Sequence, residues 1–229
     1  MSMSERIELN PRLLAAAKLM GRCQTVYDVG ADHGLLPLFL LQRGAAQRAV
    51  LSDISAFSLE KARRNAQKYA LGHLVTFHIG DGLDELTPQE GDGVSLCGMG
   101  GILQSSLLQK AERLPCPIVL QANSERMALR QALIQKGYRI QDEEIVFDAG
   151  RYYSVIRAVP GYSPALTYAE ALFGPVLIQR CDPVFLDFLR WRKRLIDKVI
   201  FGAKGNEKIC LQRELSVIEA ILCRQEYKK

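Results

Sequence analysis

The sequence predicts an α/β fold, in which helices cover a mostly parallel sheet that ends in an antiparallel hairpin, followed by a small C-terminal α-helical hairpin. Short β-branched runs alternate with helical patterns about five times along residues 24–136, which is typical of βαβ units. Two adjacent strand patterns follow, with their turn at residues 148–150. Beyond them only amphipathic helices are indicated.

Composition and charge are those of a folded protein with a mildly basic C-terminal part. The chain has 229 residues, of which 48% are hydrophobic, enough for a full core. Its net charge is +5, and residues 166–229 hold 12 Lys and Arg against 8 Asp and Glu. This balance permits an anionic partner. The Pro- and Gly-rich segment 160–164 predicts two domains, residues 1–164 and 165–229.

Cysteine usage and the N-terminal sequence indicate the cellular setting. The six cysteines are scattered without a Cys-x-x-Cys pair, and with only three histidines they predict no metal site. Such cysteines are typical of reduced thiols in a cytoplasmic protein. We find no apolar signal core and no apolar run of membrane-spanning length, so we expect no membrane partner. The sequence leaves the oligomeric state open, and a monomer is our expectation.

The first βα unit carries the clearest functional motif. Residues 24–29 predict a strand, the run Gly30-Ala31-Asp32-His33-Gly34 a tight turn, and residues 35–42 a helix. Gly30 can adopt a positive φ, and Gly34 lets the helix begin against the end of the strand. Pro37 fits the first helical turn, where its missing N–H costs little. The pattern predicts a nucleotide site at the carboxyl end of this strand.

The charges of this turn favour one class of nucleotide. Asp28 precedes the turn and Asp32 lies within it, and two carboxylates would repel the pyrophosphate of a dinucleotide. S-adenosylmethionine (SAM) carries no phosphate, and its sulfonium and ammonium groups favour neighbouring carboxylates. The residues therefore predict a SAM site, and the alternative is a glycine turn that binds nothing.

Later strand ends supply candidates for the rest of the site. Asp53 ends the second strand, where it could accept hydrogen bonds from a ribose or, alternatively, cap the next helix. Asp81 ends the third strand and could accept from an adenine amine. Three glycines in Gly98-Met99-Gly100-Gly101 indicate that a ligand approaches the backbone closely. Gln121 and Asn123, after the fifth strand, could read base edges, although Asn123 could instead cap a helix.

The C-terminal segment predicts two antiparallel helices. The first covers residues 183–201, and the second follows a turn at residues 202–206. Basic residues on the first helix and in the turn could contact phosphates, although they could equally form a solvated face. They are Arg190, Lys193, Arg194 and Lys204. Trp191 is expected to be packed rather than stacked on a base.

Five segments, spread over nearly the whole chain, carry a family resemblance. They are Asp28–Pro37, Gly80–Leu83, Gly98–Gly101, Leu120–Asn123 and Phe173–Pro175. Together they resemble the bacterial tRNA (adenine(22)-N1)-methyltransferases. The resemblance implies a Rossmann-like class I methyltransferase fold, SAM as cofactor, tRNA as partner and methylation of adenine 22 at N1.

The resemblance also implies roles for individual residues. The cofactor-binding residues would be Asp28, Gly30, Asp32, His33, Pro37, Asp53, Ile54, Asp81, Gly82, Gly98 and Met99. The target base would lie beside Gly100, Gly101, Gln121 and Asn123. Two positions depart from the family pattern: Asp53-Ile54-Ser55 stands where the family often has Glu followed by Gly-Pro, and Ala122 replaces a proline.

The chemistry of N1 methylation limits what the enzyme must provide. Adenine N1 carries a lone pair, so no base has to remove a proton first, and the main task is alignment. An acceptor for the N6 amine would stabilise the developing charge. Asp32 is the first candidate for this catalytic role, with His33 as an orienting group.

Three alternatives to this reading remain open at the level of the sequence. The first is a methyltransferase of the same fold that acts on another RNA position or on a small molecule. The second is an oxidoreductase with a variant nucleotide loop. The third is a non-catalytic RNA-binding protein on the same fold.

Overall fold

The computed structural model describes residues 5–226 and contains a seven-stranded sheet in the order β3-β2-β1-β4-β5-β7-β6. The strands are β1 (Thr25–Val29), β2 (Arg48–Asp53), β3 (Val75–Ile79), β4 (Gly93–Met99), β5 (Ile118–Ala122), β6 (Tyr138–Asp148) and β7 (Arg151–Pro160). Strands β1 to β5 pair in parallel, whereas β7 runs antiparallel to both β5 and β6. The predicted parallel sheet with a terminal antiparallel hairpin is confirmed.

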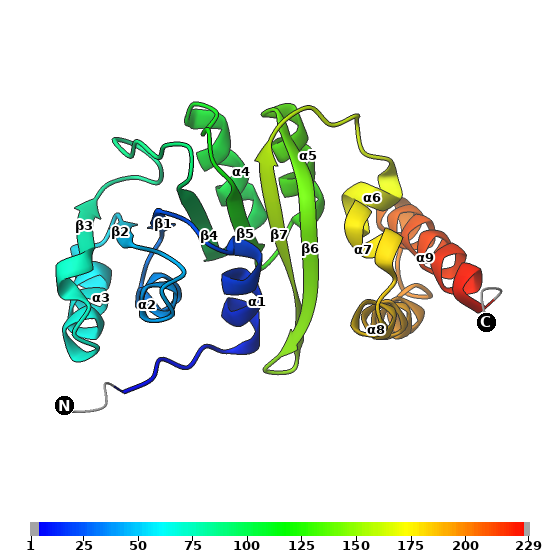
Figure 1. Ribbon diagram of the computed structural model, residues 1–229. Coiled ribbons are helices and arrows are strands. Elements are labelled where there is room, and N and C mark those ends of the chain that lie inside the picture. The colour runs from blue at the N-terminus through cyan, green and yellow to red at the C-terminus, as the bar shows by residue number, and fades with distance from the viewer. Residues whose placement is uncertain (1–4, 227–229) are drawn as a thin grey trace.

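Helices cover both faces of the sheet and continue beyond its edge. The helices are α1 (Pro11–Met20), α2 (Leu35–Gln42), α3 (Ala56–Lys68), α4 (Gly101–Lys110), α5 (Arg126–Gln135), α6 (Tyr168–Phe173), α7 (Pro175–Arg180), α8 (Pro183–Val199) and α9 (Gly205–Glu226), with a 3-10 turn at Gly72–Leu74. Helices α6 to α9 gather beyond β6, at the opposite end of the sheet from β3 (Figure 1). No helix in the described part of the chain is long and apolar enough to cross a membrane.

Each face of the sheet has its own apolar core. The alternation of side chains along β5 shows this: Val119 packs with residues of α1, α2 and α3, whereas Ile118 and Leu120 pack with residues of α4 and α5. All three side chains are fully buried. Because neighbouring residues of a strand point to opposite faces, a central strand that is buried on both sides is apolar throughout.

Local sequence explains how the first two helices begin. The Asn10 side chain accepts a hydrogen bond from the backbone N–H of Leu13 at 3.0 Å, and Pro11 is the first helical residue of α1. Helix α2 begins after Gly34, whose φ is +62°. A Cβ at Gly34 would lie 2.3 Å from a methyl carbon of Leu51, so this position requires glycine.

Some predicted elements differ from the observed ones. Helix α4 ends at Lys110, because the next segment is drawn toward β6: the Leu114 N–H donates to the Tyr138 hydroxyl at 2.8 Å. A proline after Leu114 also disfavours helix there. Asn123 does not cap α5, whose N-cap is Glu125 in a left-handed conformation. Helices α6 and α7 were not predicted, since each has only six residues.

The helices after the sheet pack around a third apolar cluster. It includes Phe185, Phe188 and Ile196 of α8 and Ile218 of α9, and Ile145 of β6 also belongs to it. The Trp191 ring lies 5.3 Å from that of Tyr152 and 6.0 Å from that of Phe188, between ring centroids. Trp191 is therefore packed, as predicted. The domain boundary after residue 164 stays a prediction.

A buried ion pair joins α5 to the hairpin and to α6. Arg130 is 1% exposed, and its Nε donates to Glu143 on β6 at 2.8 Å. The other guanidinium nitrogens donate to the Ser154 hydroxyl and to the backbone carbonyls of residues 171–173. The second oxygen of Glu143 accepts from the N–H of Val176 at 3.0 Å. Both charges are thus fully hydrogen-bonded, as buried charges must be.

Replacing Arg130 with methionine should therefore destabilise the protein by about 3–5 kcal/mol, because Glu143 would stay buried without its partner. Chemical denaturation followed by circular dichroism measures this loss. The double variant R130M/E143L is the matched control and should recover most of the stability, since it removes both charges. A loss below about 1 kcal/mol for R130M alone would contradict the assignment.

Candidate active site

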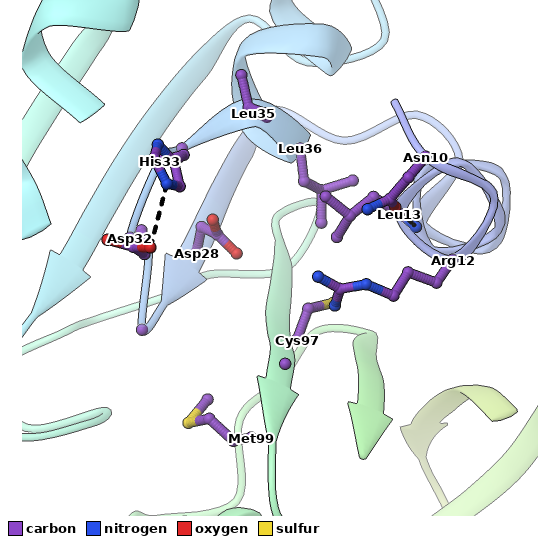
Figure 2. A pocket seen from close by; sticks show the side chains of 14 residues that line it. Asn10, Arg12, Leu13, Asp28, Asp32, His33, Leu35, Leu36, Cys97 and Met99 are labelled. Carbon is purple, nitrogen blue, oxygen red and sulfur yellow. Dashed lines mark hydrogen bonds and ion pairs between the residues drawn. The ribbon is translucent and has the colours of Figure 1, made fainter. Parts of the chain in front are cut away.

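A cavity of about 380 Å³ lies at the carboxyl ends of β1 and β4, against the glycine turn (Figure 2). Its lining residues come from α1, β1, the turn, α2 and the end of β4. They are Asn10, Arg12, Leu13, Asp28, Gly30, Ala31, Asp32, His33, Gly34, Leu35, Leu36, Cys97, Gly98 and Met99. Figure 2 shows Arg12 reaching from α1 into the space that Asp28 enters from β1. The sequence prediction placed six of these residues in the cofactor site.

Asp28 is the buried carboxyl of this cavity. It is 7% exposed and accepts a hydrogen bond from the Ser95 hydroxyl at 2.5 Å. Burial raises the pKa of Asp28 to about 7, the Ser95 hydrogen bond opposes this rise, and the charge of Asp53 adds to it. A cation placed in the cavity would favour the ionised form.

Asp32 is the accessible carboxyl of the same cavity. Its side chain is 52% exposed, and it accepts from the Lys61 ammonium at 2.8 Å. This hydrogen bond is the main reason why the pKa of Asp32 lies below its usual value. The Nε2 atom of His33 is 3.3 Å from the other carboxylate oxygen. The two predicted catalytic residues therefore lie side by side, and Asp32 is ionised at neutral pH.

A second cavity, of about 270 Å³, adjoins the first at the ends of β2 and β3. Gly30 and Met99 line both cavities. The second one is lined by the predicted cofactor residues Asp53, Ile54, Asp81 and Gly82, together with Val29, Gly80, Leu103 and Leu107. Ser55, not Asp53, is the N-cap of α3, so the alternative role for Asp53 is wrong.

The two amides after β5 hold the backbone of the Gly98 turn. The Gln121 side-chain oxygen accepts from the Gly98 N–H at 3.1 Å and from Arg12 Nη1 at 2.8 Å. Asn123 donates to the Gly98 carbonyl at 2.7 Å and accepts from the Gln121 amide at 3.0 Å. Gln121 is fully buried. That these amides read a base edge stays a prediction. In the structure they hydrogen-bond the backbone of Gly98.

A third cavity, of about 230 Å³, lies between the Gly98 turn and the β6–β7 hairpin. Its lining residues are Arg12, Gly98, Asn123, Arg151, Tyr152 and Tyr153. Four of these residues were not predicted as site residues. Tyr152 and Tyr153 belong to a regular strand pattern, and Arg12 to a regular helix pattern, so no sequence motif marks them. Only the sheet order, which puts β7 next to β5, brings them to the site.

The remaining predicted site residues lie outside these three cavities. Pro37 is buried in α2, and Gly100 is the N-cap of α4. Gly101 donates to the Ser124 carbonyl at 3.0 Å, and a Cβ at Gly101 would lie 2.5 Å from the Glu125 carbonyl oxygen. The glycine therefore allows two turns to approach each other, and its contact with the target base stays a prediction.

The basic residues predicted to contact RNA lie on α8 and in the turn after it. Arg190 pairs with Asp187 at 2.9 Å, and Lys193 with Glu219 at 2.5 Å. Arg194 and Lys204 are exposed and make no ion pair within residues 5–226. Two of the four cations are thus available to an anionic partner, and the RNA contact stays a prediction.

The described residues contain no cluster of metal ligands, and the thiol that lines the first cavity is not ionised. No group of three or more His, Cys, Asp or Glu side chains within the described residues is arranged to hold a metal ion. Cys97 lines the first cavity, and burial, followed by the charge of Asp28, raises the pKa of its thiol. This cysteine is therefore a neutral thiol at neutral pH.

Comparison with known proteins identifies the family. Residues 9–156 match the methyltransferase domain model. A tRNA (adenine(22)-N(1))-methyltransferase from Bacillus subtilis is 28% identical over 201 residues, which are 82% of each chain. A putative tRNA methyltransferase from Mycoplasma genitalium is 30% identical over 161 residues, covering 69% of this chain and 72% of the relative.

A solved structure extends the likeness to the whole chain. The crystal structure of Streptococcus pneumoniae Sp1610, a putative tRNA (m1A22) methyltransferase in complex with SAM, has a TM-score of 0.80 and 25% identity. The match covers 94% of this chain and 100% of that one. The chain therefore belongs to the methyltransferase-domain family, in the branch whose named members are bacterial tRNA (adenine(22)-N1)-methyltransferases.

Proposed function

We propose that this protein transfers the methyl group of SAM to N1 of adenine 22 in tRNA. The observation that carries the proposal is the cavity against the glycine turn, where Asp28 and Asp32 offer two carboxylates to a cationic ligand. The names of the relatives support the substrate and the position. Membership of a methyltransferase family argues against the oxidoreductase alternative.

The residues around the first two cavities fit the parts of SAM. Asp28 is a buried carboxyl with a raised pKa, which a neighbouring ammonium or sulfonium would return to the ionised form. Asp53 and Asp81 offer acceptors to ribose hydroxyls and to an amine. Ile54 and Leu103 are 74% and 52% exposed in the second cavity, and they would pack on the two sides of a flat adenine.

The residues of the protein would align the purine with the methyl group and stabilise the positive charge that develops on the ring. When bound, SAM supplies an electrophilic methyl group, and the carbon–sulfur bond breaks as the bond to N1 forms. Asp32, which is ionised, faces the same cavity and would accept from the N6 amine of the purine as positive charge develops on the ring. His33 would hold the Asp32 carboxylate in place.

We further propose that the exposed cations Arg194 and Lys204 contribute to tRNA binding, and that the enzyme acts as a monomer in the cytoplasm. The division into a methyltransferase domain (residues 1–164) and a helical tRNA-contacting domain (residues 165–229) belongs to the same proposal. The third apolar cluster supports it, because most of its members lie after residue 164.

Incubation with labelled SAM and unmodified tRNA transcripts should place the label in 1-methyladenosine, because N1 attack needs only alignment. Nucleoside digestion and mass spectrometry identify the product. A transcript with adenine 22 replaced should lose the label. Label in another nucleoside would contradict the proposed position, and the absence of label in any tRNA would contradict the proposed substrate.

Asp32→Ala should lower kcat at least tenfold and leave the fold intact, because the carboxylate is half-exposed and its ion pair with Lys61 contributes little to stability. Lys61→Met is the matched control: it removes the same ion pair, keeps the carboxylate and should retain activity. Methyl-transfer kinetics and thermal unfolding measure both effects. An Asp32→Ala enzyme with a rate within threefold of wild type would contradict the role.

The affinity for S-adenosylhomocysteine, which keeps the ammonium group, should fall by about tenfold per pH unit below pH 7. Protonated Asp28, with its pKa of about 7, no longer attracts the ammonium. The raised pKa means that the folded state binds this proton more tightly than the unfolded state does. Without ligand, the contribution of Asp28 to the free energy of unfolding is therefore present at low pH and is lost as the pH rises through 7.

Titration calorimetry between pH 6 and pH 8 measures this affinity, and Asp28→Asn should abolish its pH dependence. Asp32→Asn is the control, since the pKa of Asp32 is lowered and that group does not titrate in this range. An unchanged pH dependence in Asp28→Asn would contradict the assignment.

A further inference from the structure

The three cavities form a row along the carboxyl edge of the sheet. The first and second share Gly30 and Met99, and the first and third share Arg12 and Gly98. Their sequence follows the strand order, from β3 and β2 through β1 and β4 to β5 and β7. If SAM fills the first two cavities, as the proposed function requires, the third lies on the far side of the Gly98 turn and is available to the other substrate.

The third cavity has the chemistry of a site for a flat, electron-poor ring. Its lining residues are Tyr152 and Tyr153, Asn123 and two arginines, together with Gly98. The Tyr152 ring is fixed, since it packs against Phe147, Phe188 and Trp191 with ring centroids 4.9–5.4 Å apart. The only cation or ring that contacts the Tyr153 ring within the described residues is Arg12, whose guanidinium carbon lies 5.7 Å from its centroid.

We infer that this cavity binds the purine that receives the methyl group, that the N1 and N6 edge of the purine points past Gly98 toward Asp32 in the first cavity, and that Tyr153 is its stacking partner. This inference rests on the proposed function and extends it to residues of the β6–β7 hairpin. A base inside folded tRNA must leave its stack to be methylated. An aromatic side chain beside the cofactor site compensates for the lost stacking.

Tyr153 also suits the charge that the reaction creates. Methylation at N1 turns a neutral purine into a planar cation, and the face of an aromatic ring attracts a cation. The attraction grows as the charge develops, so it favours the transition state over the bound substrate. The guanidinium of Arg12 shows that this ring already accommodates a planar cation. Arg12 itself is neutralised in part by Asp148, with Nε 4.0 Å from the carboxylate.

Arg151 supplies a contact for the nucleic acid backbone. It is the first residue of β7, directly after the two-residue turn of the hairpin, and its side chain is exposed at the mouth of the third cavity. It makes no ion pair within residues 5–226. A flipped nucleotide carries its phosphates to the mouth of the pocket, where a guanidinium can bind them in a bidentate manner.

Substitutions of Tyr153 test the inference with the full-length protein and a tRNA transcript. Tyr153→Phe keeps the ring face and should retain kcat/KM within about threefold. Tyr153→Leu keeps apolar bulk without the ring face, and Tyr153→Ala removes both, so each should lower kcat/KM for tRNA about ten- to a hundredfold. Tyr162→Ala is the matched control, because Tyr162 is 87% exposed and lines none of the three cavities.

Two further readouts separate base binding from folding and from the cofactor. Affinity for S-adenosylhomocysteine and the unfolding temperature should be unchanged in Tyr153→Leu, since Tyr153 lines neither of the first two cavities. With 2-aminopurine in place of the target adenine, wild type should give the fluorescence change of a base that leaves its stack, and Tyr153→Ala a smaller one.

The outcomes distinguish the two proposals. A wild-type enzyme that methylates tRNA, together with Tyr153→Leu and Tyr153→Ala variants of unchanged kcat/KM, would overturn the base pocket and leave the proposed function standing. A parallel loss of tRNA activity and of S-adenosylhomocysteine affinity would also overturn it, by assigning Tyr153 to the cofactor. A wild-type enzyme that methylates no tRNA would overturn both.

Discussion

The arrangement of this site depends on one buried amide, that of Gln121. Its oxygen accepts from the Gly98 N–H and from Arg12, and its nitrogen donates to Asn123. From behind, Gln104 of α4 donates to the backbone carbonyls of Leu96 and Gln121. The diverging ends of β4 and β5 are thus kept hydrogen-bonded where the ladder between them is irregular. The same contacts fix the Gly98 turn, and Gly98 lines both the first cavity and the third.

Because of this arrangement, the enzyme needs few dedicated catalytic groups. The turn after β1 presents carboxylates to the first cavity, and Tyr153 of the hairpin lines the third cavity, with Gly98 common to both. A reaction that consists of aligning a lone pair with a methyl group requires rigid walls more than acids or bases. Rigid walls follow from the buried hydrogen bonds of Gln121 and from the packing of Tyr152 against α8.

Much of the fold, and the gathering of the proposed cofactor residues along one edge of the sheet, could be predicted from the sequence, because both follow from local rules. The turn contains two positions, Gly30 and Gly34, whose backbone conformation favours glycine. Asp53 and Asp81 follow strands whose carboxyl ends meet at one edge of the sheet because the strands are parallel. The Gln121 and Asn123 amides were predicted as site residues, but their hydrogen bonds to Gly98 depend on a contact between two separate turns, which spacing does not reveal.

The proposed base pocket could not be predicted for a different reason. Arg12, Arg151 and Tyr153 carry no motif, and they meet only because β7 inserts between β5 and β6 in the sheet. The helices α6 and α7 escaped prediction because six residues are too few for a periodic pattern. The break of α4 at Lys110 reflects a tertiary hydrogen bond to Tyr138, which overrides helix propensity.

The end of α1 depends on a residue that the ribosome adds much later. Arg157 of β7 donates to the carbonyls of Leu19 and Met20, which are the last residues of α1 and are otherwise left without helical partners. During synthesis, about 140 further residues must therefore be added before the carbonyls at the end of α1 can accept these hydrogen bonds. Contacts so distant in sequence form late in folding. A chain released before β7 would lack both this anchor and Tyr153, the proposed stacking residue, so a truncated product would not present the complete proposed site to RNA.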